Sequence, residues 1–165
     1  MLDARLQSAL NDQVNAEFTS AYQYLAMAAQ FEAMNLPGSA AWMRRQAREE
    51  IGHAMKFFDY IVDRDGRAML QAVGKPKGEF KSPLEMWEAV YRNERAVTAR
   101  IDALYAQAEK AKDYATVAML QWFVTEQVEE EKTAKAILEQ VRMIGPSSSS
   151  ILFIDRHLGK DAAKE

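Results

Sequence analysis

Residues 66–82 read GRAMLQAVGKPKGEFKS, and this segment decides how the rest of the chain is connected. It contains Gly74, Pro76 and Gly78, which interrupt regular structure, so we expect a loop. Seventeen extended residues can span roughly 56 Å at about 3.3 Å each. A helix of about 28 residues is only about 42 Å long. The loop can therefore run the full length of a helical bundle and join two parallel helices.

Four long segments with helical periodicity flank this crossover, two on each side. Apolar residues recur every three or four positions, as in amphipathic helices, through about 3–34, 37–65, 83–111 and 113–144. The breaks within each pair are short, so each pair should form an antiparallel hairpin. The sequence therefore predicts an all-α fold in one domain, 1–165. It consists of a four-helix bundle at about 3–144 with one long crossover loop and a short fifth helix at about 148–159.

The expected helix ends carry recognisable signals. Ser82 followed by Pro83 and Glu85 has the pattern of a capping box with proline at the first helical position. Gly145 followed by Pro146 is a typical stop for the fourth helix.

Composition and charge exclude several classes of protein. The formal net charge is −3, so no global basic field favours nucleic acid, and there is no cysteine for a disulfide or a thiolate site. No stretch approaches the roughly 20 apolar residues of a membrane span, and the N-terminus lacks a secretory pattern. We expect a cytoplasmic protein that binds neither membrane nor nucleic acid.

Polar side chains interrupt the apolar stripes of all four long segments. They stand where a plain bundle would place leucine or isoleucine: Glu17, Glu50, His53, Glu94, Gln127 and Glu130. Burying one unpaired carboxylate costs several kcal/mol, and no Lys or Arg lies on these stripes nearby. Two divalent cations would compensate four carboxylates and an imidazole.

The spacing of these residues supports a metal site. Glu50 and His53 are three residues apart and project from one helical face, as do Gln127 and Glu130. Oxygen-rich ligation with one histidine favours iron or manganese over structural zinc. A carboxylate can bridge two metal ions, and Glu50 is our choice for the bridge. A Glu-x-x-His pair alone is usually a solvated helix face, but an acid on the apolar stripe of all four helices is much less easily accidental.

The chain from Met1 to about Leu158 resembles the bacterial non-haem ferritins. The stretches that carry the resemblance are 15–17, Tyr24, 44–45, 49–53, 58–60, Glu94, 120–124, 126–132 and 153–155. Many other di-iron bundles repeat Glu-x-x-His on the fourth helix. Here that helix has Gln127 and Glu130 instead, which is the ferritin version.

The resemblance implies roles for individual residues. One iron site would use Glu17, Glu50 and His53, and the other would use Glu50, Glu94 and Glu130. Gln127 would be a hydrogen-bond partner on the oxygen-binding side, and Tyr24 could supply an electron. A third iron site would use Glu49, Glu126, Glu129 and Glu130. Without the family, the run 126–131 reads as a solvated helix face and Tyr24 equally well as a core tyrosine.

The resemblance also implies an activity and an assembly. The activity would be ferroxidase: Fe(II) is oxidised by dioxygen and stored as ferric mineral inside a hollow homo-oligomer of 24 subunits. The apolar tail Ile151–Ile154 with Leu158 is too short to be a stable isolated helix, so it must pack on something. Haem is not expected, because the position after the bridging glutamate, which is Met in bacterioferritins, is Ile51.

Three other classes of protein would show different sequence patterns. A rubrerythrin-like peroxidase or oxygenase would carry a second Glu-x-x-His. The twelve-subunit DNA-protecting relatives of ferritin build their metal site between subunits. A metal-free structural or signalling bundle would not place acids on the apolar stripes of four helices.

Overall fold

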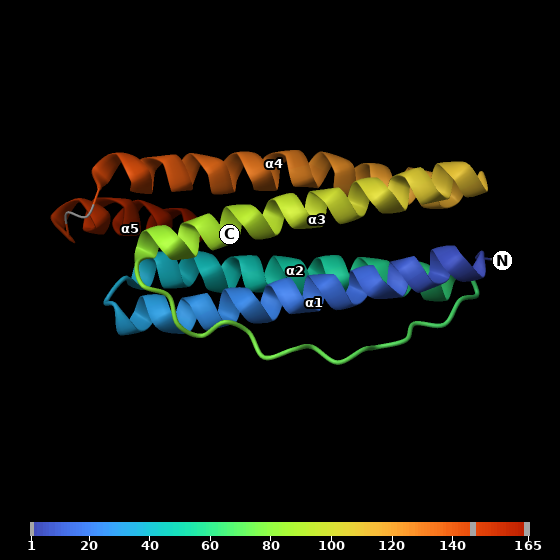
Figure 1. The fold of residues 1–165 in the computed structure, drawn as a ribbon, viewed down its shortest axis with the longest axis horizontal. Coiled ribbons are helices and arrows are strands. Elements are labelled where there is room, and N and C mark those ends of the chain that lie inside the picture. The colour runs from blue at the N-terminus through green and yellow to red at the C-terminus, as the bar shows by residue number, and fades with distance from the viewer. Residues whose placement is uncertain (1, 146–147, 164–165) are drawn as a thin grey trace.

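The computed structural model describes residues 2–145 and 148–163, and within them the chain forms five α-helices (Figure 1). They are α1 (Ala4–Ala33), α2 (Pro37–Asp63), α3 (Pro83–Ala111), α4 (Tyr114–Ile144) and α5 (Ser148–Ala162). The expected all-α bundle with a short fifth helix is confirmed, with bounds within about three residues of those expected. The predicted stop is confirmed at Gly145, which has a φ of 62°, whereas Pro146 lies outside the described residues.

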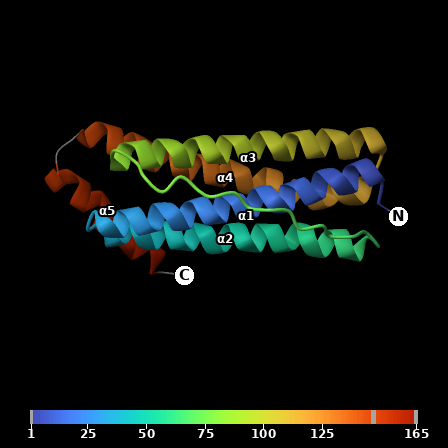
Figure 2. The same cartoon turned by 60° about the horizontal axis from the view of Figure 1, so that its bottom comes forward.

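The long connection runs along the bundle as expected. It leaves the end of α2 and returns beside α1 to the opposite end of the molecule, so α2 and α3 point the same way (Figures 1 and 2). Side-chain amides of α1 hold it in place. Asn11, Gln23 and Gln30 each exchange hydrogen bonds with the backbone of the crossover, at residues 67–69, at Lys77 and at Phe80 respectively.

Side-chain caps begin three of the long helices. Asp3 accepts from the N–H groups of Arg5 and Leu6, and Asp113 accepts from that of Thr116. At α3 the capping box is only half formed. Ser82 Oγ accepts from Glu85 N–H at 3.2 Å, but the Glu85 carboxylate accepts from Lys81 N–H at 2.6 Å rather than from Ser82 N–H.

The core is divided into two apolar clusters along the bundle. One, near α5, includes Phe31, Trp42 and Trp87, and the other, at the opposite end, includes Phe57 and Leu120. On each of the four long helices, the polar side chains that interrupt the apolar stripe lie between residues of one cluster and residues of the other. The fold therefore encloses a polar layer across its middle, which is where the site lies. None of the helices in 2–145 and 148–163 has the length and apolar character needed to cross a membrane.

Candidate metal centre

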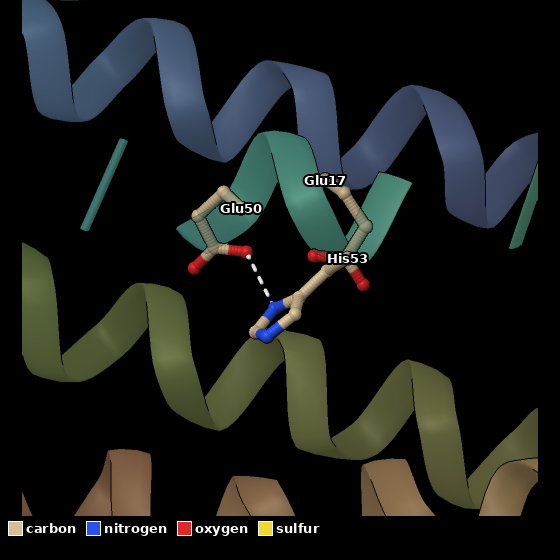
Figure 3. A group of neighbouring side chains, drawn as sticks. All are labelled: Glu17, Glu50 and His53. Atoms are coloured by element: carbon tan, nitrogen blue, oxygen red, sulfur yellow. Dashed lines mark ion pairs between the residues drawn. The ribbon is translucent and has the colours of Figure 1, made fainter. Parts of the chain in front are cut away.

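Three predicted ligands meet in the polar layer. Glu17 reaches inward from α1, and Glu50 and His53 project from α2 (Figure 3). One ligand atom from each of the three lies within 4.8 Å of the others. The residues are 0%, 2% and 7% exposed, respectively. Two acids and an imidazole with converging donor atoms inside a protein are a suitable set for a divalent metal ion.

The orientation of His53 is fixed from both sides. Its Nδ1 lies 3.4 Å from Glu50 Oε2, one helical turn away on the same face of α2. The edge-on contacts of its ring are with Trp122 and Phe123 of α4, at centroid separations of 5.5 and 5.8 Å. These aromatic contacts leave the imidazole few alternative positions, so the ring nitrogen stays directed at the carboxylates.

Two oxygen atoms of this group lack a hydrogen bond from any N–H group. Glu17 Oε2 and Glu50 Oε2 are buried, and neither accepts a hydrogen bond from an N–H group of the described residues, although His53 Nδ1 lies 3.4 Å from Glu50 Oε2. The two acids can hydrogen-bond to each other only if one of them holds a proton. Buried polar atoms are nearly always bonded, so such a pair needs an explanation. A cation between the two carboxylates would satisfy both oxygens, and the donor set therefore fits a metal ion.

Glu94 and Glu130 lie beside this group, on α3 and α4. Glu94 is buried and accepts from the Tyr24 hydroxyl, and Gln127 Nε2 lies 3.4 Å from its second oxygen. Glu130 is half-buried and accepts from Gln46 Nε2 at 3.0 Å. The structure does not bring these two carboxylates within the 4.8 Å group of Glu17, Glu50 and His53.

The electrostatics of the layer favour protonated acids when no cation is present. Burial, followed by the negative charge of Glu94, raises the pKa of Glu50 to about 8. Burial, followed by the same Glu94 charge, raises the pKa of Glu130 to about 7. Burial also raises the pKa of Glu17 and of Glu94. Burial and mutual repulsion thus favour the protonated forms of these acids, and a metal ion that binds their carboxylates would have to displace protons.

The residues expected at a third iron site are less closely gathered. Glu49 Oε1 lies 3.7 Å from Arg45 Nε. The side chain of Glu129 is 65% exposed, and its Oε2 lies 3.2 Å from Lys132 Nζ. Glu126 is half-buried, and its charge and that of Glu49 both raise the pKa of Glu130. The third site therefore stays a prediction, supported by Glu49 and Glu126 more than by Glu129.

Residues around the ligands contribute contacts that were not predicted. Gln13 donates to Glu17, Gln46 donates to Glu130, and Thr98 accepts from Gln127. Only Gln13 gave a signal in the sequence, because it lies on the apolar stripe of the first helix. Arg100 bonds to Gln13 from the surface, and nothing in the sequence placed it there.

Comparison with known proteins agrees with this geometry. Residues 7–144 match the model of the ferritin-like domain family. The chain is 41% identical to the bacterial non-heme ferritin of Bacteroides fragilis over 160 residues, which are 97% of this chain and 99% of the relative. It is 38% identical to that of Staphylococcus epidermidis over all of this chain and 99% of the relative.

Solved structures give the same result. An open pore ferritin from the archaeon Archaeoglobus fulgidus superimposes with a TM-score of 0.95 at 46% identity. The match covers 96% of this chain and 98% of that one. The resemblance thus extends over sequence, fold and nearly the whole length of both proteins, and this chain belongs to the ferritin family.

Proposed function

We propose that this ferritin oxidises Fe(II) with dioxygen at a di-iron centre formed within one subunit by Glu17, Glu50, His53, Glu94 and Glu130. Iron storage with ferroxidase activity is the function of the bacterial ferritins to which the chain belongs. The observation that carries the proposal is the buried Glu17–Glu50–His53 group, in which one ligand atom from each residue lies within 4.8 Å of the others.

The acids divide naturally between two metal positions that share Glu50. Its nearest ligand partners are Glu17 and His53, and the charges of Glu94 and Glu130 both act on its pKa. We assign Glu17, Glu50 and His53 to one Fe(II) ion and Glu50, Glu94 and Glu130 to the other. A shared Glu50 carboxylate would hold the two ions near each other, so that each could give one electron to the same dioxygen molecule.

The residues around the two metal positions would contribute negative charge and hydrogen bonds to the reaction. Anionic oxygen ligands stabilise Fe(III), the harder and more highly charged product, over Fe(II). Gln127 is buried beside Glu94 and presents an amide N–H to its carboxylate. We propose that it acts as a hydrogen-bond partner on the oxygen-binding side. The Tyr24 hydroxyl donates to the same carboxylate, and we propose that Tyr24 can supply an electron. Oxidised iron would then pass inward by way of Glu49, Glu126, Glu129 and Glu130.

A mineral store needs a container, and ferritins form oligomeric shells. We propose a shell of 24 copies, with α5 as a contact between subunits. Ile154 and Leu158 of α5 are buried against the bundle, whereas Phe153 is 79% exposed and Leu152 45% exposed. These two apolar side chains are what a neighbouring subunit would cover. We propose iron alone as the bound metal, without haem, because Ile51 offers no sulfur ligand.

Stopped-flow oxidation tests the centre. Anaerobic protein is loaded with two Fe(II) ions per subunit and mixed with dioxygen, for the wild type, Glu50→Ala and the control Glu109→Ala. Glu109 is an exposed acid near the end of α3. Glu50→Ala should abolish the fast phase by removing the shared ligand, and Glu109→Ala should leave it unchanged.

Rapid oxidation of two irons per subunit in Glu50→Ala would show that the centre lies elsewhere. The assembly is tested separately by sizing chromatography at neutral pH and by electron microscopy after aerobic iron loading. Dense cores inside hollow shells are expected. A monomer on the sizing column would contradict the proposed shell of 24 subunits.

A further inference from the structure

A hydrogen-bonded chain connects an exposed cation on α3 to the carboxylate of Glu17. Arg100 Nε donates to Gln13 Oε1 at 3.1 Å, and Gln13 Nε2 donates to Glu17 Oε1 at 2.7 Å. A second bond, from Arg100 Nη2 to the backbone oxygen of Asp12 at 2.9 Å, fixes the guanidinium against α1. Gln13 and Glu17 are 1% and 0% exposed, so water does not compete for their bonds.

The chemistry of arginine fixes which way the Gln13 amide faces. The two ends of a glutamine amide have nearly the same shape, and only the hydrogen-bond partners distinguish oxygen from nitrogen. Arginine has only donors, so the oxygen of Gln13 must face Arg100. The NH₂ group of Gln13 is then forced to face Glu17.

This orientation differentiates the two oxygens of Glu17. Oε1 receives the Gln13 donor, whereas Oε2 is buried and accepts no hydrogen bond from an N–H group of the described residues. Oε2 is therefore the Glu17 oxygen that has no competing donor and is better placed to bind a metal ion. If the amide turned over, its oxygen would face and repel Oε1, and the difference between the two oxygens of Glu17 would be lost.

We propose that Arg100 is a positioning residue which, through Gln13, makes Glu17 a one-oxygen metal ligand. The inference rests on the proposed function, because it requires Glu17 to bind metal. Arg100 does not contact the carboxylate of Glu17 directly. Its positive charge polarises the Gln13 amide, and that amide donates to Glu17 Oε1. Changes to outer partners of metal ligands commonly lower metal affinity by about 10- to 100-fold.

Cobalt(II) binding to metal-free, assembled protein under anaerobic conditions measures this effect without iron oxidation. The visible bands of Co(II) report coordination number, and the titration reports affinity. Arg100→Met removes the donors but keeps a long apolar stem. The matched control is Arg95→Met, another exposed arginine of α3. Arg100→Met should weaken the tightest site on the order of tenfold and change the band pattern, while Arg95→Met should match the wild type.

A double-mutant cycle separates positioning from a general effect on folding. Gln13→Met removes the donor to Glu17, and if Arg100 acts through Gln13, adding Arg100→Met should cause no further change. Additive losses, or a wild-type spectrum and affinity in Arg100→Met, would overturn the inference. Glu17→Gln tests the underlying function: if it leaves the Co(II) spectrum of the otherwise unmodified protein unchanged, the metal centre itself is misassigned.

Discussion

The carboxylate of Asp155 on α5 caps the start of α2 at Gly38. One carboxylate oxygen accepts from Gly38 N–H at 3.0 Å, and the other accepts from Ser39 N–H at 2.7 Å. Leu36, which precedes α2, has no side chain that can accept these bonds. An acid 117 positions away in sequence therefore provides the cap. Because α2 carries Glu50 and His53, the fifth helix stabilises the element that presents the metal ligands.

Removing this cap should destabilise the protein measurably. Asp155→Ala leaves two buried N–H groups without acceptors, and losing an N-cap typically costs about 0.5–2 kcal/mol. We expect a lower Tm at fixed protein concentration. The control is Arg156→Ala, a change to an exposed residue of the same helix, for which about 0.5 kcal/mol or less is expected. Equal Tm values for the two variants would show that the Asp155 bonds contribute nothing.

Substitution by alanine should lower Tm at one glycine of α2 and raise it at another. A methyl group at Gly38 would lie 1.8 Å from the backbone oxygen of Asp155, so Gly38→Ala must displace α5. A methyl group at Gly52 meets nothing within 4 Å. In a helix interior Ala is favoured over Gly by about 0.8–1 kcal/mol, so Gly52→Ala should raise Tm. Thermal unfolding of both metal-free variants tests this. A Gly38→Ala variant with the Tm of the wild type would contradict the close packing of α5 against the start of α2.

The raised pKa of Glu50 predicts a specific pH dependence. In the folded, metal-free protein this acid keeps its proton up to about pH 8, whereas in the unfolded chain it loses the proton near its ordinary value of 4.5. The stabilising contribution is therefore complete below about pH 4.5 and is lost as pH rises towards 8. Glu50→Gln cannot ionise, so its Tm should fall less over this range.

Metal should reverse this trend, because it binds the ionised form. Anaerobic Co(II) affinity should rise with pH towards about 8, with proton release, in the wild type. Calorimetry in buffers of different ionisation enthalpy counts the released protons. If Co(II) affinity depended on pH in the same way in the wild type and in Glu50→Gln, then Glu50 would not be the group whose ionisation controls metal binding.

Periodicity and connection lengths were enough to predict the bundle. The apolar stripes placed four helices within about three residues of their ends, and the length of 66–82 identified the crossover. The same stripes identified Glu17, Glu50 and His53 as candidate ligands, because burying a polar or charged side chain on an apolar face is costly unless something compensates its charge. These predictions depend on local spacing, which a sequence displays directly.

The contacts around the ligands depend on distant parts of the chain and were not predictable. Arg100 and Gln13 are 87 positions apart, and Asp155 caps a helix from the far end of the sequence. In the capping box, the Glu85 carboxylate can accept a hydrogen bond from the N–H of either Lys81 or Ser82, and the sequence motif alone does not show that Lys81 is the donor. Such partners follow from how the helices pack rather than from the periodicity of any one of them.

The crossover provides a last test, at Gln30. Its Nε2 donates to the Phe80 backbone oxygen at 2.6 Å, and its Oε1 accepts from Phe80 N–H at 2.8 Å, while the Phe80 ring packs into the apolar cluster near α5. Gln30→Met keeps the volume and removes both bonds, and each bond contributes about 1 kcal/mol. Hydrogen exchange at the Phe80 amide should therefore accelerate by on the order of tenfold. Gln140→Met, at an exposed position on α4, should leave that exchange rate unchanged. Unaltered protection in Gln30→Met would mean that the buried ring, and not the amide pair, holds the crossover against α1.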